Sequence, residues 1–500
     1  DRDPTAVAVT QLALSLACAD RSGGSGSVPP LATPDGPDSP NGLNSPDSPA
    51  AAPATLAEMS DTRSPGTVVC ADSLLDPLGA GLGDGSFDAV IGNPPWGQKG
   101  FRFAPDQAAA LRARYVTATG ALDPFKLFVE RAHQLIAAGG RWGLLLPDII
   151  LLKNHQPVRD LILRESHLRW IADVGRAFAG VNLDAVAMIG QRRSEASSQP
   201  SSQPEPATDR ENSPAAPGSV AIWHSVPPTW RDHPPATRHL DQAVFAELDG
   251  HKFNIHLTPG DLRLLRQLAE LPRLGQIFEA HEGVHSGNVR AKLFRDHRAS
   301  EHCVPLILGR GEIARYALRW DGRWLDRSPG LVDRAAGEDA NQGRPAWHCR
   351  PKIVVRRTGD RLIAAYDQRG YYVANNLFVV LPRPSAPAMD TAELRAYVAL
   401  LNSRCITWYF RTVQPRTGRL FAELKIEHLL AFPRPAEPVW RPLVPRLAEL
   451  CAAIEQALDR PDSPQREPAP PCAAAEQDEI DRLILAALGL PGDLAGEPSR

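Results

Sequence analysis

A run of four residues, Asn93-Pro94-Pro95-Trp96, combines residue types that can hold and activate a planar amino group. The lone pair of such a nitrogen is delocalised into its ring, so the nitrogen attacks poorly until two acceptors draw its N–H groups out of plane. The Asn93 side-chain oxygen and the Pro94 carbonyl are two acceptors, held close together because consecutive prolines restrict the backbone. The Trp96 ring adds a face on which an extruded base can stack. We therefore predict these four residues as a catalytic turn.

The elements around the turn alternate between strand and helix patterns. TVVCADSL and FDAVIG are typical of short strands, DPFKLFVERAHQLIAAGG of an amphipathic helix ended by glycines, and RWGLLLPDIILL and HLRWIADVG of further strands. This alternation predicts an α/β fold with a mostly parallel sheet, in which ligands bind at the carboxyl ends of the strands. The Asn93 turn directly follows one of these strands.

Tracts rich in Ser, Pro, Gly and Ala divide the chain. The second folded unit mixes short strands (VPLILG, PKIVVRR, YYVANNLFVVLP) with helices (LRLLRQLAEL, AELRAYVALLNSR), which indicates an α+β domain. The predicted parts are a catalytic domain (1–192) with a disordered insertion (21–66), a linker (193–219), the α+β domain (220–455), a second linker (456–476) and a C-terminal helix (477–500).

Composition indicates a globular protein whose uneven charge fits either an anionic partner such as nucleic acid or an ordinary arginine-rich surface. The net charge is −3, but residues 221–450 carry 33 Lys and Arg against 24 Asp and Glu, a local charge of +9. The seven cysteines are scattered without a C-x-x-C pair, which is typical of reduced thiols. No apolar run reaches the length of a membrane span, so we expect a cytoplasmic protein without membrane contact.

The Asn93 turn and its flanks resemble the motifs of class I amino-methyltransferases, which transfer a methyl group from S-adenosylmethionine to adenine N6 or cytosine N4. DRDPTAVAVTQLAL resembles the second motif, which implies that Asp1 binds the cofactor ribose. VVCADSL resembles the third, which implies that Asp72 lies near the cofactor adenine. RAFAGVNLDAVAMIG resembles the eighth, which implies that Phe178 stacks on the target base beside Trp96. A turn-forming aspartate at Asp72 and a core residue at Phe178 are the structural alternatives.

The resemblance extends to the adenine-specific restriction–modification branch. LDPFKLFVERAHQLIAAGGRWGLLLPDIILL is similar to its later catalytic motifs, and FEAHEGVHSGN, VPLILGRGEI, PKIVVRR, LLNSR and EIDRLILAALGL are similar to its target-recognition region and C-terminus. The glycine-rich first motif of the family should precede Asp1, so we interpret the chain as N-terminally truncated and expect this stretch alone to lack activity. GAGLGDGS precedes a strand instead of following one, and we interpret it as a turn.

The resemblance implies a site-specific DNA adenine-N6 methyltransferase that uses S-adenosylmethionine, needs no metal and acts on double-stranded DNA. A restriction endonuclease domain or subunit would be its functional partner. Two alternatives stay open from the residues: a protein glutamine-N5 methyltransferase, which also uses an Asn-Pro-Pro turn, and a non-catalytic DNA-binding module. The predicted DNA contacts, for which a plain solvated surface is the alternative, are Arg310, Arg315, Lys352, Arg356, Arg357, Arg411, Arg416 and Arg419.

Two other motifs suggest different chemistry and are weaker. HEGVH at residues 281–285 fits the H-E-x-x-H zinc-protease pattern, but that pattern requires a helix and Gly283 disfavours one. We therefore predict a loop there. Pro471-Cys472 matches the nucleophile of cytosine-C5 methyltransferases, but it lies in a proline-rich tract that cannot hold a rigid site.

Overall fold

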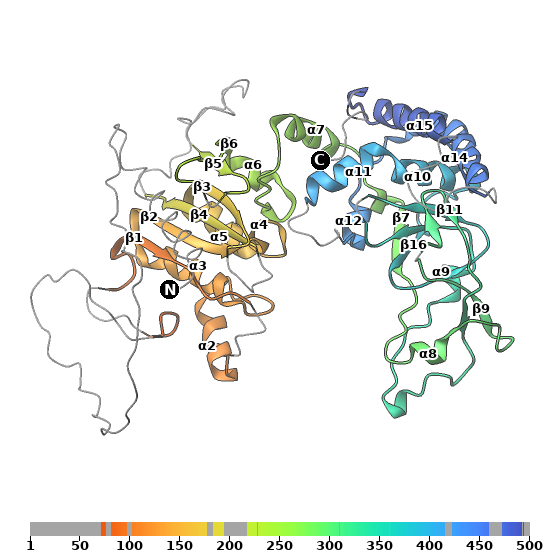
Figure 1. Ribbon diagram of the computed structural model, residues 1–500, viewed down its shortest axis with the longest axis horizontal. Coiled ribbons are helices and arrows are strands. Elements are labelled where there is room, and N and C mark those ends of the chain that lie inside the picture. The colour runs from red at the N-terminus through yellow and green to blue at the C-terminus, as the bar shows by residue number, and fades with distance from the viewer. Residues whose placement is uncertain are drawn as a thin grey trace, which may run out of the picture. The chain divides into compact units, whose positions relative to one another are not determined.

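The computed structural model divides the chain into two compact units, Asp1–Phe253 and Asn254–Arg500 (Figure 1). The strand predicted from TVVCADSL lies largely outside the described residues, as does most of the sequence before it. The structure describes residues 72–76, 82–97, 103–177, 184–194, 218–227, 229–309, 311–359, 361–415, 423–459, 473–492 and 494.

A six-stranded sheet in the order β1-β2-β4-β3-β5-β6 forms the centre of the first unit. The first six residues of β4 are buried, as expected for an apolar strand covered on both faces. The strands of the sheet are β1 (Phe87–Gly92), β2 (Ile136–Pro147), β3 (Ser166–Gly175), β4 (Ala185–Arg192), β5 (Ser219–Trp223) and β6 (Arg238–Asp241).

The α/β class of this unit is confirmed, but its described sheet is mixed where a mostly parallel one was expected. β1 pairs with β2 and β3 with β5 in parallel, whereas β4 runs antiparallel to both β2 and β3, and β6 antiparallel to β5. The connection from β3 to β4 is too short for a crossover helix, so the two strands pair as an antiparallel hairpin.

Helix α3 (Pro124–Leu135) packs against β2 and against α5 (Gln156–Glu165), which in turn contacts β3 (Figure 1). Pro124 suits its first position because that residue needs no amide donor, and the buried side chains of Phe125 and Leu127 form its inner face. The remaining helices of the unit are α2 (Pro105–Arg114), α4 (Ile149–Leu152), α6 (Gln242–Glu247) and the 3-10 turn η2 (Asp249–His251).

Two local boundaries differ from the sequence prediction. The chain becomes extended at Ile136, so the residues up to Gly139 and Gly140 belong to β2 and the glycines do not end α3 directly. The run RWGLLLPDIILL is a strand only to Pro147, where the missing amide ends the pairing ladder, and its last residues form the short helix α4.

The predicted domain boundary near residue 220 is also displaced. β5 pairs with β3 through Trp170 and Ala221, so residues 218–253 complete the first unit and the second begins at Asn254. The C-terminal helix α15 (Ala474–Ala487) belongs to the second unit's core through buried Ile480 and Ile484. Both errors concern pairings between residues far apart in the sequence.

The second unit contains an antiparallel sheet in the order β14-β13-β16-β7, a four-stranded sheet in the order β15-β9-β12-β8, and the hairpin β10-β11. These sheets confirm the α+β prediction. The strands are β7 (Phe278–Glu282), β8 (Phe294–Arg295), β9 (Cys303–Ile307), β10 (Ile313–Ala314), β11 (Ala317–Leu318), β12 (Trp324–Asp326), β13 (Lys352–Arg356), β14 (Ala364–Asp367), β15 (Tyr372–Val373) and β16 (Leu377–Pro382).

Helices α10, α14 and α15 pack together over the sheet that contains β14, and their apolar faces join its side chains in one buried cluster (Figure 1). Asp390 starts α10 with a reciprocal cap to Glu393, a stabilising pattern at a helix start. The helices are α7 (Pro259–Ala269), α8 (Arg290–Leu293), α9 (Pro345–His348), α10 (Thr391–Asn402), α11 (Arg404–Val413), α12 (Ile426–Leu430), α13 (Glu437–Trp440), α14 (Val444–Leu458) and α15, with short 3-10 turns η3 (Leu274–Gln276), η4 (Arg334–Ala336) and η5 (Arg441–Leu443).

Within the described part of the chain, no helix combines the length and the apolar character needed to cross a membrane.

Candidate active site

The Asn93 turn leaves the sheet at the carboxyl end of β1, as predicted. Asn93 is exposed, Pro94 is buried, and Trp96 and Gly97 are half-buried. Gly97 has a φ of +96°, in the left-handed region that favours glycine. The turn therefore presents the Asn93 side chain to solvent while its proline and Trp96 anchor it to the domain.

Trp96 packs on an apolar cluster of the sheet that includes buried Leu145, Ala172 and Ala187. Trp170 and Trp223 belong to the same cluster, with their rings in edge contact at a centroid distance of 5.0 Å. One part of the Trp96 surface is thus used in packing, which fixes the plane of its ring.

A buried carboxylate that the sequence analysis did not single out holds the far end of the turn. Asp123, only 2% exposed, precedes α3, and its Oδ1 accepts a hydrogen bond from the Gly97 amide at 3.3 Å. Burial raises the pKa of Asp123 above its ordinary value, against the lowering effect of the Gly97 amide. Burying a carboxyl group costs free energy unless it is hydrogen-bonded, and the bond that Asp123 accepts from Gly97 links the turn to the start of α3.

The helix α3 also carries buried charges that hold the loop after α2. Lys126 donates to the carbonyls of Thr119 (2.8 Å) and Ala121 (2.7 Å), and Glu130 accepts from the Thr117 amide (2.9 Å) and hydroxyl (2.8 Å). Burial lowers the pKa of Lys126. A buried charge with several hydrogen-bond partners requires those partners at defined positions. Lys126 and Glu130 therefore fix the position of the 115–122 segment on α3.

Asp72 lies in an exposed turn, where its Oδ1 accepts from the amides of Leu74 (2.9 Å) and Leu75 (3.2 Å). This is the turn-forming role that the sequence left open as an alternative. The turn is tied to the domain by Tyr115, whose hydroxyl donates to the Leu74 carbonyl at 2.7 Å, and by Arg131 of α3, which donates to the Ser73 carbonyl at 3.1 Å. Helix α3 thus fixes both the Asp72 turn and the Asn93 turn.

The DNA contact predicted at Lys352 is wrong. It is fully buried on β13, where its ammonium group forms an ion pair with buried Asp367 and donates to the His348 carbonyl at 2.6 Å. Burial lowers the pKa of Lys352, while Asp367 opposes this shift. A fully buried charge cannot reach a phosphate, so Lys352 neutralises Asp367 inside the second unit instead.

Two arginines predicted to contact DNA have partners inside the second unit. Arg315 donates to the Gln477 side-chain oxygen at 2.5 Å and to the carbonyl of Asn402, so it ties α15 to the end of α10. Arg357 forms an ion pair with Glu423 at 2.6 Å. Both groups would have to exchange these partners to bind a phosphate.

The remaining predicted residues divide into two sets. Arg356 is exposed at the end of β13, and Arg411 is half-buried on α11. The others lie outside the described residues, namely Asp1, Phe178, Arg310, Arg416 and Arg419.

The H-E-x-x-H pattern does not form a helix. His281 and Glu282 are the last residues of strand β7, and His285 lies in the segment that follows it. The loop predicted for residues 281–285 therefore begins at Gly283. The His281 ring stacks on Trp347 at 3.9 Å. Among the residues that the structure describes, no group of three or more His, Cys, Asp or Glu side chains is placed to hold a metal ion. Pro471-Cys472 lies outside those residues.

Two family models match the chain. Residues 1–178 match the Eco57I restriction-modification methylase, and residues 304–433 match the TaqI-like C-terminal specificity domain. A curated relative, the type II methyltransferase M.PaeR7I of Pseudomonas aeruginosa, is 34% identical over 104 residues, which are 21% of this chain and 17% of that protein.

Solved structures with similarity to the chain include two restriction–modification enzymes. The type IIL enzyme MmeI in complex with DNA is 12% identical, with 82% of this chain and 55% of that chain covered and a TM-score of 0.49. The type IIG restriction endonuclease BpuSI is 12% identical, with 80% and 54% covered and a TM-score of 0.31. The chain therefore spans about half the length of each of these enzymes.

Proposed function

We propose that the chain is a restriction–modification DNA methyltransferase that methylates the N6 amino group of adenine in double-stranded DNA at a defined sequence. The observation that carries this proposal is the Asn93 turn at the carboxyl end of β1, inside the region that matches the methylase family and anchored by buried Asp123. The exposed Asn93 side chain supports a role in contacting substrate, because nothing in the packing of the turn requires it.

The proposed role of the turn is to orient and activate the target amino group. Asn93 Oδ1 and the Pro94 carbonyl would accept its two N–H groups, which concentrates the nitrogen lone pair outside the ring plane. Trp96 would stack on the base, which must leave the helix because a paired amino group cannot meet both acceptors. Catalysis then comes mainly from positioning and from acceptors fixed before the reaction.

S-adenosylmethionine, when bound, supplies an electrophilic methyl group on a sulfonium centre. Of the residues proposed to hold it, Asp72 is described, exposed, and part of a turn that Tyr115 and Arg131 fix in place. A fixed, exposed carboxylate suits the amino or hydroxyl donors of a nucleoside. Asp72 would therefore hold the cofactor adenine, and Asp1 the ribose.

In this proposal the second unit binds the target sequence and helps to extrude the adenine, and the reaction takes place in the cytoplasm. The match of residues 304–433 to a specificity domain supports that division of labour. A restriction endonuclease domain or subunit that cleaves the unmethylated sequence would be the functional partner. Phe178, Arg310, Arg356, Arg411, Arg416 and Arg419 remain proposed base-stacking and DNA contacts.

The test is transfer of a radiolabelled methyl group from S-adenosylmethionine to DNA by the protein expressed from its complete gene. Mass spectrometry of the digested DNA should find N6-methyladenine with the unaltered protein and none with Asn93→Ala. Label in N4-methylcytosine would reject adenine as the target. Label in a protein glutamine, with DNA unmodified, would reject DNA as the substrate.

A further inference from the structure

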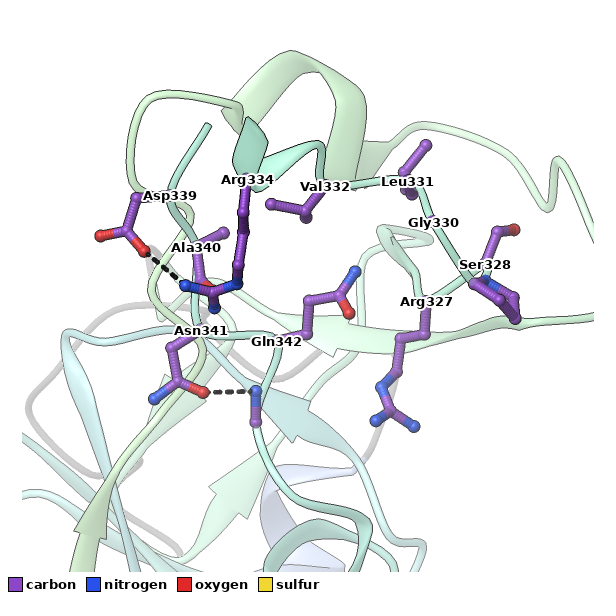
Figure 2. A pocket seen from close by; sticks show the side chains of 12 residues that line it. Arg327, Ser328, Gly330, Leu331, Val332, Arg334, Asp339, Ala340, Asn341 and Gln342 are labelled. Atoms are coloured by element: carbon purple, nitrogen blue, oxygen red, sulfur yellow. Dashed lines mark hydrogen bonds and ion pairs between the residues drawn. The ribbon is translucent and has the colours of Figure 1, made fainter. Parts of the chain in front are cut away.

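The long segment between β12 and α9 walls a cavity of about 590 Å³ in the second unit (Figure 2). The segment has no regular structure except the 3-10 turn η4, and a connection of this length without its own strands or helices is uncommon unless it has a function. Its lining is polar, with side chains of Arg327, Arg334, Asn341 and Gln342 around the same hollow. The hollow thus presents several hydrogen-bonding side chains to whatever enters it.

The backbone of this segment is fixed by the neighbouring residues 285–288. His285 and Asn341 exchange two backbone hydrogen bonds of 2.8 Å, and Asn288 accepts from the Asp339 amide at 2.9 Å. At Gly287, with a φ of +50°, an added Cβ would lie 1.7 Å from the Asp339 carbonyl oxygen, so only glycine permits the approach. The cavity wall is therefore a rigid platform.

The side chains on the platform differ in the contacts that they make within the protein. The Arg327 guanidinium lies over the buried Tyr372 ring, 4.9 Å from its centroid, and its Nε is buried, which leaves its two terminal nitrogens for a ligand. Gln342 Nε2 donates a long hydrogen bond of 3.4 Å to the Asp326 carbonyl, whereas its Oε1 accepts none from the part of the chain that the structure describes. Arg334, in contrast, is paired with Asp339 at 3.5 Å.

We propose that this platform reads base edges of the target DNA, with Gln342 contacting an adenine and Arg327 a guanine. A carboxamide offers the donor and acceptor that adenine N6 and N7 require, and a fixed guanidinium offers the two donors that guanine O6 and N7 require. Phosphates carry only acceptors, so a phosphate site would have no use for the carboxamide oxygen. The assignment rests on the proposed function, since it names the part of the second unit that selects the sequence.

Selection of bound duplexes from a random pool, followed by sequencing, tests the assignment without requiring methyl transfer. The protein expressed from its complete gene should select one sequence, and Gln342→Ala should lose roughly 5- to 150-fold of its discrimination at a single A·T position. Gln342→Glu, which only accepts hydrogen bonds, should shift that position toward cytosine. Arg327→Ala should relax a G·C position. All these variants keep the backbone bonds that hold the platform.

Arg441→Ala provides the matched control, because Arg441 is an exposed arginine outside the platform, paired with Glu437. It should leave the selected sequence unchanged. Salt dependence separates base from phosphate contacts: Gln342→Ala should keep the slope of log affinity against log salt, whereas loss of a phosphate contact lowers it by about 1. Uniform weakening across sequences, an unchanged selected sequence in both variants, or no sequence selection by the unaltered protein would each overturn the assignment. Failure of methyl transfer alone would reject only the proposed reaction.

Discussion

Replacing Asp123 tests whether the catalytic turn is held in place from α3. Asp123→Ala removes the acceptor of the Gly97 amide and leaves that half-buried donor without its 3.3 Å partner. An unsatisfied, partly buried donor costs about 1 kcal/mol of unfolding free energy. The substitution also removes a buried carboxyl group whose desolvation disfavours folding, and this offsets part of the loss. The net decrease in unfolding free energy should therefore be small.

The effect on catalysis should be much larger than the effect on stability. A displacement of the turn by roughly 1 Å moves the acceptors away from the target amino group, and such a misplacement costs about 100-fold in rate. We therefore expect Asp123→Ala to lower kcat for DNA methylation by about that factor, with the affinity for DNA little changed. Asp123→Asn keeps an acceptor oxygen and should recover most of kcat.

The raised pKa of Asp123 adds a pH dependence with a definite sign. A carboxyl group whose pKa is higher in the folded protein stabilises it fully below the ordinary value of 3.8 and loses that contribution as the pH rises through the folded pKa. Asp123→Asn lacks this loss, so its stability relative to the unaltered protein should be greater at pH 7 than at pH 4. Urea unfolding at both pH values measures the difference, and steady-state methylation at saturating DNA and S-adenosylmethionine measures kcat. Equal kcat in Asp123→Ala and the unaltered protein, or an Asp123→Asn variant as slow as Asp123→Ala, would refute the positioning role.

Three further predictions concern residues fixed by the fold. Gly97→Ala forces a side chain into a φ of +96° and should cost about 1–2 kcal/mol, measured by urea unfolding, with a loss of kcat; unchanged stability would contradict the observed turn. Lys352→Ala leaves the buried Asp367 carboxylate without its cation and should cost about 3–5 kcal/mol, whereas Lys352→Met with Asp367→Asn, which keeps an acceptor for the amides of Arg369 and Gly370, should recover much of it; a folded Lys352→Ala variant with reduced salt dependence of DNA binding would instead support a phosphate contact. Burial raises the pKa of Glu312 to about 7, so its stabilising contribution is complete below 4.5 and lost as the pH rises through 7; Glu312→Gln should therefore raise Tm at pH 8 and not at pH 4, and an equal shift at both would contradict this.

Local patterns predicted most of the elements near the site. FDAVIG and HLRWIADVG are strands, and LRLLRQLAEL and AELRAYVALLNSR contain helices, because each signal is a short apolar period that the element itself expresses. The Asn93 turn could be found because its residue types carry the chemistry within four positions. These features need no information from distant parts of the chain.

The errors arose where distant residues decide the outcome. Lys352 reads as a surface cation, but Asp367 on the adjacent strand pairs with it inside the sheet. The sequence pattern assigned residues 220–253 to the second unit, but the pairing of β5 with β3 places them in the first. Asp123 before Pro124 is typical of a plain helix start, and only the position of Gly97 in space shows its other partner. A sequence gives the types of such residues, but not their partners.

The central claim is that the Asn93 turn methylates adenine in DNA, and single-molecule sequencing tests it most directly. DNA from a methylation-free host expressing the complete gene would be compared with DNA from the same host expressing Asn93→Ala. We predict N6-methyladenine at one defined sequence with the unaltered gene and none with the variant. Unmodified DNA in both, from soluble protein that binds S-adenosylmethionine, would contradict the claim, as would methylation that persists in Asn93→Ala.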